Sequence, residues 1–336
     1  MTAPSADQTG PAFRRVLAAL RGDPVDRVPL AFWRHFYQEE RSPEALAAAT
    51  WEFVQRLGLD LAKLTPSSFY AVEGWGAEVH YPGHEDRPPT LKRPVIQKPE
   101  GWRDLLSLDL AVGALGREME TIRLLRAHTR GQIPLLMTVY SPLTLAFKLA
   151  GERVVEHLRE EPQALHFGLA VITETTARFA RQSLARGADG IFFATQLASR
   201  SWLTEVEYQT FGIHYDLIVL EAIQGTSRLT LLHLHGPEVF FDLVNRYPVH
   251  AVSWDEGKGS PTLAEAQRLT DKGLVGGLSR ELLHSGSAEA VAEQARQAIR
   301  QTCGRRLILA PSCALLPGTP EENLLTVREV VRSFIL

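Results

Sequence analysis

Eight short apolar segments, each followed by an amphipathic helical pattern, constrain the fold of this 336-residue chain more than any other feature. Most of them carry apolar residues at consecutive positions and are bounded by Gly, Pro, Asp or Ser. This pattern is typical of parallel strands that are buried on both faces. The predicted strands cover residues 28–33, 61–65, 133–139, 190–193, 228–234, 251–254, 274–278 and 307–310.

The segments between these strands carry helical periodicity and helix-terminating residues. For example, Ser42 and Pro43 begin one predicted helix, and Gly58 ends it. The predicted helices cover residues 12–20, 43–57, 117–129, 162–186, 205–223, 237–246, 263–272, 288–302 and 320–334.

Eight strands that each precede a helix predict an α/β protein with a single (β/α)8 barrel, a TIM barrel, and an N-terminal helix. An open doubly wound sheet is the alternative, but no G-x-G-x-x-G motif follows the first strand. Residues 1–10 are polar and predict a flexible tail, so the barrel domain spans residues 11–336. The Gly- and Pro-rich stretch 70–101 predicts an excursion after strand two, such as a hairpin.

Charge and cysteine content exclude several classes of function. The formal net charge is −3, so the chain has no basic field for nucleic acid or an anionic membrane. The most apolar stretch, 133–147, is interrupted by polar residues and is too short to span a bilayer. Only Cys303 and Cys313 are present, which excludes a disulfide framework. With no signal-peptide pattern, we expect a cytoplasmic protein.

Two histidines and a cysteine fall where a barrel carries its chemistry, at the C-terminal ends of the strands. His233 and His235 are two residues apart and therefore project to the same side of a strand. Cys313 follows the last strand at the same rim. Two imidazoles and one thiolate form a three-ligand zinc site with an open fourth position. The alternatives are a hydrogen-bonded histidine pair and a small buried thiol; Cys303, at a helix end, is expected to be structural.

The rim also carries acids and glycines. Asp255 follows strand 251–254 and is a candidate general acid or base, or a partner of a ligand histidine; a helix cap is the alternative. Its neighbour Glu256 is the weaker candidate. Gly276 and Gly277 let backbone amides approach a substrate anion, or form a close-packed turn.

Three further residues complete the predicted site. Arg34 is a candidate for gripping a substrate carboxylate, with surface pairing as the alternative. Tyr140 follows the strand 133–139 and is a candidate catalytic residue, beside a helix start whose amides face the site. Thr195 follows strand 190–193 and is a candidate for substrate binding.

Several segments together resemble the uroporphyrinogen decarboxylase superfamily over almost the whole chain. This superfamily implies a single (β/α)8 barrel, often in a homodimer. The resembling segments are Arg15 with the run 20–29 (LRGDPVDRVP), the helix start 141–146 (SPLTLA), the strand 187–191 (GADGI) with Tyr208, Phe211 and Tyr215 after it, and the last helix start 317–323 (PGTPEEN).

One branch of the superfamily is the decarboxylase of porphyrin biosynthesis, which removes four acetate carboxyl groups from uroporphyrinogen III without a cofactor or metal. This chain departs from it at most of the site. Only Arg34 remains of the Arg-Gln-Ala-Gly-Arg-Tyr stretch, and the Asp after strand two has no counterpart in 66–69. Lys148 replaces its Tyr, Ala194 replaces the Asp of its Phe-Asp-Ser, and Cys313 replaces the His of its Gly-His-Gly.

The other branch consists of zinc methyltransferases that move a methyl group between a corrinoid protein and a thiol such as coenzyme M. Their His-x-Cys-Gly motif and last-strand Cys correspond to His233, His235 and Cys313, with His235 replacing the first Cys. Because histidine is a normal zinc ligand, metal binding survives this change. The resemblance implies an enzyme in which zinc holds a substrate thiol as its thiolate and a corrinoid partner protein supplies the methyl group.

Two other functions remain open from the sequence. One is a divergent decarboxylase or another lyase acting on a tetrapyrrole or a small carboxylic acid, with Arg34 and the Gly276-Gly277 turn holding the acid. The other is a non-catalytic barrel that binds a metal or a tetrapyrrole. The partner of the methyltransferase would be a small-molecule thiol. The partner of the lyase would be a tetrapyrrole or a small carboxylic acid.

Overall fold

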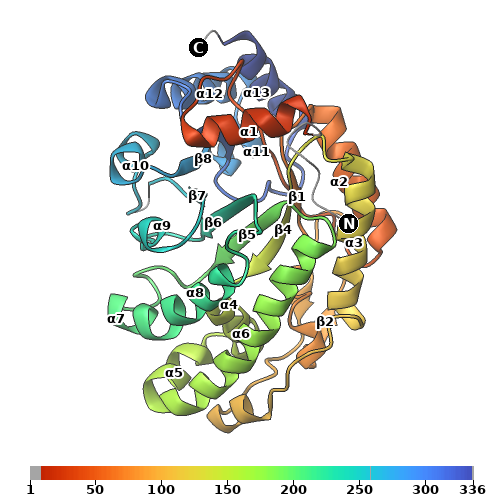
Figure 1. Cartoon of the computed structure of the whole chain (residues 1–336), viewed down its shortest axis with the longest axis vertical. Helices are drawn as coiled ribbons and strands as arrows, with labels where there is room; N and C mark the ends of the chain where they lie inside the picture. Colours follow the sequence, from red (N-terminus) through yellow and green to blue (C-terminus); the bar gives the residue numbers. More distant parts are fainter. Residues whose placement is uncertain (1–8, 258, 335–336) are drawn as a thin grey trace.

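A curled parallel sheet surrounded by helices forms the centre of the protein, described here from a computed structural model that places residues 9–257 and 259–334 (Figure 1). The fold is α/β and TIM-barrel-like, as the alternation of elements predicts. The predicted tail at 1–10 lies outside the described residues except for Thr9 and Gly10, which are both buried.

Seven strands form this sheet in the described part of the chain, in the order β1-β4-β5-β6-β7-β8-β9, and neighbouring strands pair in parallel. All their residues are buried, which explains the continuous apolar runs in the sequence. The strands are β1 (Ala62–Leu64), β4 (Leu135–Tyr140), β5 (Gly190–Thr195), β6 (Leu229–Leu234), β7 (Ala251–Trp254), β8 (Gly273–Leu278) and β9 (Leu307–Pro311).

The predicted strand at 28–33 is wrong as a full strand, so the count of eight is corrected to seven strands and a bridged segment. Leu30 forms an isolated parallel bridge with Leu309 of β9. Pro29 has no N–H, and the N–H of Leu30 donates to a side chain, the carboxylate of Asp60, at 2.9 Å. The segment still lies between the first and last strands, because the Asp60 N–H donates to the Leu30 carbonyl.

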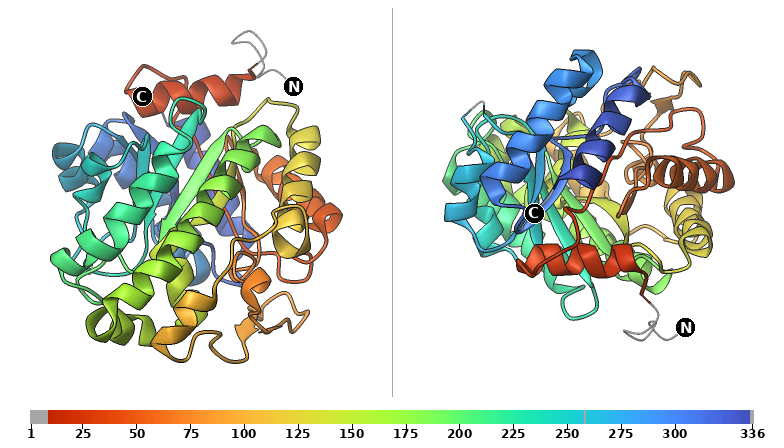
Figure 2. Two further views of the ribbon diagram at one scale, coloured as in Figure 1. Left: turned by 60° about the horizontal axis from the view of Figure 1, so that its bottom comes forward. Right: turned by 90° about the horizontal axis from the view of Figure 1, so that it is seen from above.

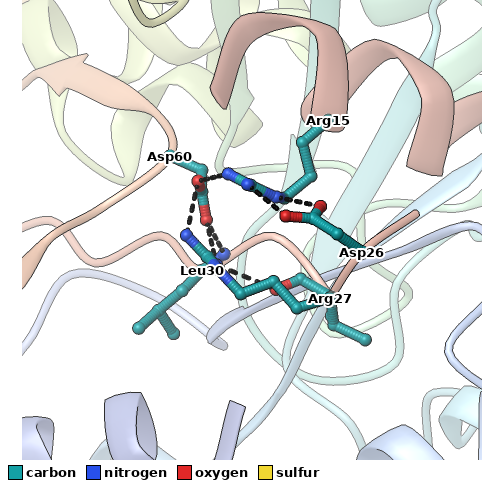
Figure 3. A network of polar contacts seen from close by, with 6 residues as sticks. Arg15, Asp26, Arg27, Leu30 and Asp60 are labelled. Carbon is teal, nitrogen blue, oxygen red and sulfur yellow. Dashed lines mark hydrogen bonds and ion pairs between the residues drawn. The ribbon is translucent and has the colours of Figure 1, made fainter. Parts of the chain in front are cut away.

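Asp60 also joins an ion-pair network that fixes the beginning of the chain (Figure 3). Its carboxylate, 1% exposed, lies 2.6 Å from Nη1 of Arg15 and 2.7 Å from Nη1 of Arg27. Arg15 pairs in addition with Asp26 at 2.6 Å. Arg15 and the run 20–29, which carry part of the family resemblance, therefore have a structural role: they hold the beginning of the chain against Asp60.

Helix α1 (Pro11–Arg21) lies across one end of the sheet (Figure 2). Gly22, in the left-handed conformation with φ 78°, ends this helix. Leu20 packs so closely on Gly273, the first residue of β8, that a Cβ there would lie 2.2 Å from Leu20 Cδ2. Because α1 covers the N-terminal ends of the strands, the C-terminal ends remain for the functional site.

Most predicted helices are present within a few residues of their expected bounds. The helix predicted over 205–223 is α7 (Glu205–Tyr208), a π-helical turn (Gln209–Ile213) and α8 (His214–Glu221). The other predicted helices are α2 (Pro43–Leu57), α3 (Gly113–Thr129), α6 (Pro162–Ala185), α10 (Leu263–Leu269), α12 (Ala288–Thr302) and α13 (Glu321–Ser333). Three more helices lie outside the predicted ranges: α4 (Pro142–Ala150), α5 (Arg153–Glu160) and α11 (Arg280–Ser285).

The helix predicted over 237–246 is wrong for its first half. Only α9 (Leu243–Arg246) is helical. Glu238 adopts a positive φ of 50°, and Val239 forms an antiparallel bridge with Ser199. Both features are incompatible with an α-helix at these residues.

The excursion after the second predicted strand contains the expected hairpin, β2 (Val79–His80) paired with β3 (Thr90–Leu91) in antiparallel register. Two 3₁₀ turns, Glu73–Trp75 and Pro99–Asp104, flank it. Of the helices that the structure describes, none is long and apolar enough to cross a membrane.

Candidate metal centre

Three side chains from two distant strands converge at the C-terminal rim of the sheet. His233 lies on β6, in register with Ala194 of β5 and Ser253 of β7, and His235 follows directly after the strand. Cys313 follows β9. One ligand atom from each of His233, His235 and Cys313 lies within 4.8 Å of the others. The geometry that the metal prediction requires is therefore present.

Hydrogen-bonding partners orient two of these groups. Cys313 Sγ lies 3.8 Å from Nδ1 of His235. Nδ1 of His233 lies 3.3 Å from the Ser253 hydroxyl, which leaves its Nε2 for a ligand role. His233 is buried, whereas His235 and Cys313 are partly exposed at the rim.

The protonation states of these groups suit a metal. Burial by itself raises the pKa of the Cys313 thiol, but hydrogen bonds and charge interactions with His233 and His235 outweigh it, so the pKa lies well below its usual range. Burial lowers the pKa of His233 and favours the neutral imidazole. A thiolate and neutral imidazoles are the forms that bind metal ions.

The donor set fits zinc. Two nitrogens and one sulfur are ligands that zinc prefers, and they leave a fourth position for substrate. Zinc bonds to these atoms are about 2.0–2.3 Å long, so donors within 4.8 Å of one another can reach a common ion with small side-chain movements.

Two buried lysines were missed from the sequence as candidate site residues, and one of them, Lys63, lies near this centre. Lys63 lies on β1, and its Nζ is 4.4 Å from the ring centroid of Phe192. The Phe192 ring lies 5.0 Å from the ring of His233. Lys148 lies on α4, with its Nζ 4.4 Å from the ring centroid of Tyr140. The available signal was the single charged residue within the strand predicted at 61–65, because a strand buried on both faces seldom carries one.

Tyr140 and Arg34, both predicted as site residues, lie in different surroundings. Tyr140 ends β4 and is buried; burial, followed by the charge of Cys313, raises the pKa of its hydroxyl. Nε of Arg34 donates to the His35 carbonyl at 3.3 Å, and its guanidinium lies 5.6 Å from the Phe36 ring centroid. Among the described residues, Arg34 forms no ion pair with a carboxylate.

The two acids and Gly277, predicted at the rim, line a pocket apart from the metal candidates. Asp255, Glu256 and Gly277 line a pocket of about 180 Å³ between β8 and α12, and none of the three metal candidates lines it. The Glu256 carboxylate accepts a hydrogen bond from the backbone N–H of Leu263 at 2.9 Å. Burial raises the pKa of Glu256, and the backbone amides of Leu263 and Gly277 oppose this shift.

Gly277 and Thr195 have structural roles in this arrangement. A Cβ on Gly277 would lie 2.7 Å from Cβ of Ala298, which is the close-packed turn considered as the alternative. The Thr195 hydroxyl donates to the His233 carbonyl at 3.1 Å and so positions β6. Gly276 is less crowded; its nearest neighbour would be a Glu256 oxygen, 3.9 Å from an added Cβ.

Fold and site together define a TIM-barrel-like protein with a candidate metal centre at its C-terminal rim. The sequence profile of the uroporphyrinogen decarboxylase (URO-D) family matches residues 12–334, so the chain belongs to this family. The resemblance inferred from sequence motifs is thus confirmed.

Relatives from both branches of the family resemble this chain over nearly its full length. The methylcobamide:CoM methyltransferase MtbA of Methanosarcina acetivorans is 21% identical over 338 residues, covering 95% of this chain and 97% of that protein. A uroporphyrinogen decarboxylase of Anaeromyxobacter is 24% identical over 353 residues, covering 95% and 98%. The structure of a methyltransferase from Methanosarcina mazei has the same fold, with a TM-score of 0.84 at 22% identity, covering 96% of this chain and 98% of that one.

Proposed function

We propose that this protein is a zinc-dependent methyltransferase that moves a methyl group from a corrinoid, carried by a partner protein, to the sulfur of a small thiol. The convergence of His233, His235 and Cys313 within 4.8 Å carries the proposal. The similarity to MtbA over nearly the whole chain supports it. The decarboxylase relatives alone would not account for a cysteine and two histidines at the rim.

His233, His235 and Cys313 would hold the ion. When bound, zinc would stabilise the substrate thiol as its thiolate at neutral pH, which is the nucleophilic form. Transfer forms one S–C bond and breaks the bond between the methyl carbon and its donor, whose electron pair stays with the donor.

The surrounding residues hold this geometry and limit access of water. Ser253 fixes the orientation of the His233 ring through Nδ1. Phe192 and Trp33, whose ring centroids lie 5.4 Å apart in an edge-to-face contact, form an apolar wall beside His233. Apolar side chains that exclude water lower the local dielectric constant, which strengthens the electrostatic interactions of a thiolate with its surroundings.

Methyl transfer from methylcobalamin to thiols tests the proposal, with thioether formation followed by mass spectrometry. Cys313→Ala should lose bound metal and transfer while keeping its fold, because barrel stability resides in the packed interior and helices. Cys303→Ala is the matched control, since Cys303 is exposed at the end of α12. Zinc-loaded protein that transfers no methyl group, or a Cys313→Ala protein that transfers it normally, contradicts the proposal.

A second candidate is a lyase that decarboxylates a tetrapyrrole or a small carboxylic acid. The buried Lys63 favours it, since it adds positive charge near His233, and so does the similarity to the Anaeromyxobacter decarboxylase. Metal content separates the two candidates, because the decarboxylase branch works without a metal.

A further inference from the structure

A polar pocket at the C-terminal rim has no part in the proposed methyl transfer. Its volume is about 180 Å³, and it is lined by residues at the C-terminal ends of β7, β8 and β9 and by one face of α12. None of His233, His235 and Cys313 lines it. Binding sites for drug-sized ligands measure roughly 300–1,000 Å³, so this pocket suits a smaller organic molecule.

An unpartnered hydroxyl group indicates that the pocket receives a ligand. Ser312 is the residue after β9; it lines the pocket and is only 6% exposed. Its backbone N–H donates to the Leu278 carbonyl at 2.9 Å, which fixes its position. Its Oγ has no hydrogen-bond partner among the described residues. Because buried hydroxyl groups are normally hydrogen-bonded, Ser312 is available to a ligand that supplies a donor or an acceptor.

Glutamine side chains of α12 add further polar groups. Gln294, Gln297 and Gln301 line the pocket, and their spacing of three and four residues places them on one face of the helix. The side-chain oxygen of Gln294 accepts a hydrogen bond from the Ser279 N–H at 3.0 Å. The amide NH₂ group of Gln294 therefore remains to donate to an oxygen of the ligand.

The charged groups of the pocket are acidic. Asp255 and Glu256 line it, and no Lys, Arg or His is among its described lining residues. The Leu263 N–H donates to the Glu256 carboxylate at 2.9 Å and fixes this group at the wall. Burial raises the pKa of Glu256, and the charge of Asp255 contributes in the same direction. A cation in the pocket would offset both effects, whereas a ligand carboxylate or phosphate would be repelled.

The remaining walls distinguish an organic cation from a metal ion. Leu263, Leu278 and Ala298 give the pocket an apolar side, which suits the alkyl chain of a ligand. A metal ion is usually held by several convergent carboxylate, imidazole or thiolate groups. Within the described residues, the group of such side chains that is close enough for an ion is the rim centre, which includes neither Asp255 nor Glu256.

We propose that this pocket binds a small organic amine that carries a hydroxyl or carbonyl group on a short chain. The ammonium group lies at the Glu256 carboxylate, and the oxygen lies at Ser312 and the Gln294 amide. The chain packs on the apolar side. The site is separate from the metal centre, and its ligand needs neither zinc nor a methyl donor, so the inference does not depend on the proposed function.

Calorimetric titration with four matched compounds tests the charge requirement. 4-Aminobutanol carries the cation and the oxygen, butane-1,4-diol lacks the cation, 4-hydroxybutyrate carries an anion in its place, and butylamine lacks the oxygen. The amine is protonated at neutral pH. 4-Aminobutanol should bind about 10-fold to 100-fold more tightly than the diol, as expected for hydrogen bonds to a charged group, and 4-hydroxybutyrate should bind most weakly. Equal affinity for 4-aminobutanol and the diol overturns the proposal.

Variants of Glu256 and Ser312 locate the ligand. Glu256→Gln removes the charge but keeps an oxygen for the Leu263 N–H, so the fold should persist while the preference for the amine over the diol is lost. Glu52→Gln, at an exposed position on α2, is the matched control and should not change the affinity. Ser312→Ala should weaken binding of 4-aminobutanol by about 2-fold to 10-fold and leave that of butylamine unchanged. Because it removes an unpartnered hydroxyl, thermal melting should show no loss of stability.

Amines can also bind zinc, so each titration is repeated on zinc-loaded and on chelator-treated protein. Equal affinity in both forms supports the separate site. Binding that requires zinc, or a preference for the amine that persists in folded Glu256→Gln, overturns the proposal. If either variant does not fold, the ligand series on the wild-type protein decides. Amine binding without any methyl transfer leaves this site intact and removes the proposed function alone.

Discussion

Ser253→Ala removes the group that orients His233 and should weaken metal binding without changing the ligands themselves. Ser253 is fully buried on β7, and its hydroxyl lies 3.3 Å from Nδ1 of His233. No other described residue bonds to that nitrogen, so the substitution leaves it unpaired in a buried position.

The expected size follows from this geometry. Leaving a buried polar group without its partner costs about 1–3 kcal/mol. At 3.3 Å the bond is longer than the usual range, which places the loss near the lower end. A loss of about 1.4 kcal/mol corresponds to tenfold weaker binding. This agrees with the roughly 10–100-fold effects seen for partners of metal-ligating histidines.

Competition with a chromophoric chelator measures the zinc affinity. Ser183→Ala is the matched control, because Ser183 is also fully buried but bonds to the Phe179 carbonyl within α6, away from the site. Unchanged zinc affinity in folded Ser253→Ala, or an equal loss in Ser183→Ala, refutes the assigned role of Ser253.

Three other predictions concern stability and specificity. Asp60→Ala should destabilise the fold by about 3 kcal/mol or more in urea unfolding, because it removes the buried partner of Arg15 and Arg27. Asp23→Ala, which breaks a half-exposed pair with Arg21, should cost at most about 1 kcal/mol, and equal losses contradict the buried network. Burial raises the pKa of Glu40 in the folded protein to about 8, whereas in the unfolded chain this carboxyl has an ordinary pKa. As the pH rises, the unfolded chain therefore loses this proton first, and the folded state loses stability between about pH 4.5 and 8. Glu40→Gln should therefore gain about 1.4 kcal/mol over wild type per pH unit in unfolding measured at pH 5, 6 and 7, and a pH-independent difference argues against the buried acid. Uroporphyrinogen III should not be converted efficiently to coproporphyrinogen III in an anaerobic chromatographic assay, because Cys313 and Lys148 replace decarboxylase site residues; efficient conversion rules out the methyltransferase assignment.

The strands of the fold were predictable because each is a local apolar run with its own boundaries. The segment at 28–33 has the same local pattern but not the same pairing. Its Leu30 amide bonds to Asp60, thirty residues away, and no local pattern contains that partner. The helix expected at 237–246 failed for a similar reason, since Val239 pairs with the distant Ser199.

The metal candidates were predictable because parallel strands of a barrel end at one rim, which brings His233 and Cys313 together from 80 positions apart. The hydrogen bonds of the other rim groups depend on partners from neighbouring elements, which the sequence does not reveal. The Glu256 carboxylate accepts a hydrogen bond from the Leu263 amide, and the Thr195 hydroxyl bonds to the His233 backbone. Lys63 was overlooked because its burial depends on rings from distant segments, Trp33 and Phe192 of β5.

Zinc X-ray absorption tests the central claim most directly, on protein purified without chelator or nickel affinity. We predict about one zinc per chain, bound through nitrogen and a single sulfur at about 2.3 Å, with a second sulfur appearing when 3-mercaptopropionate is added. Protein without zinc, or a sulfur count that does not change with the thiol, contradicts a metal centre at His233, His235 and Cys313 that receives a substrate thiol.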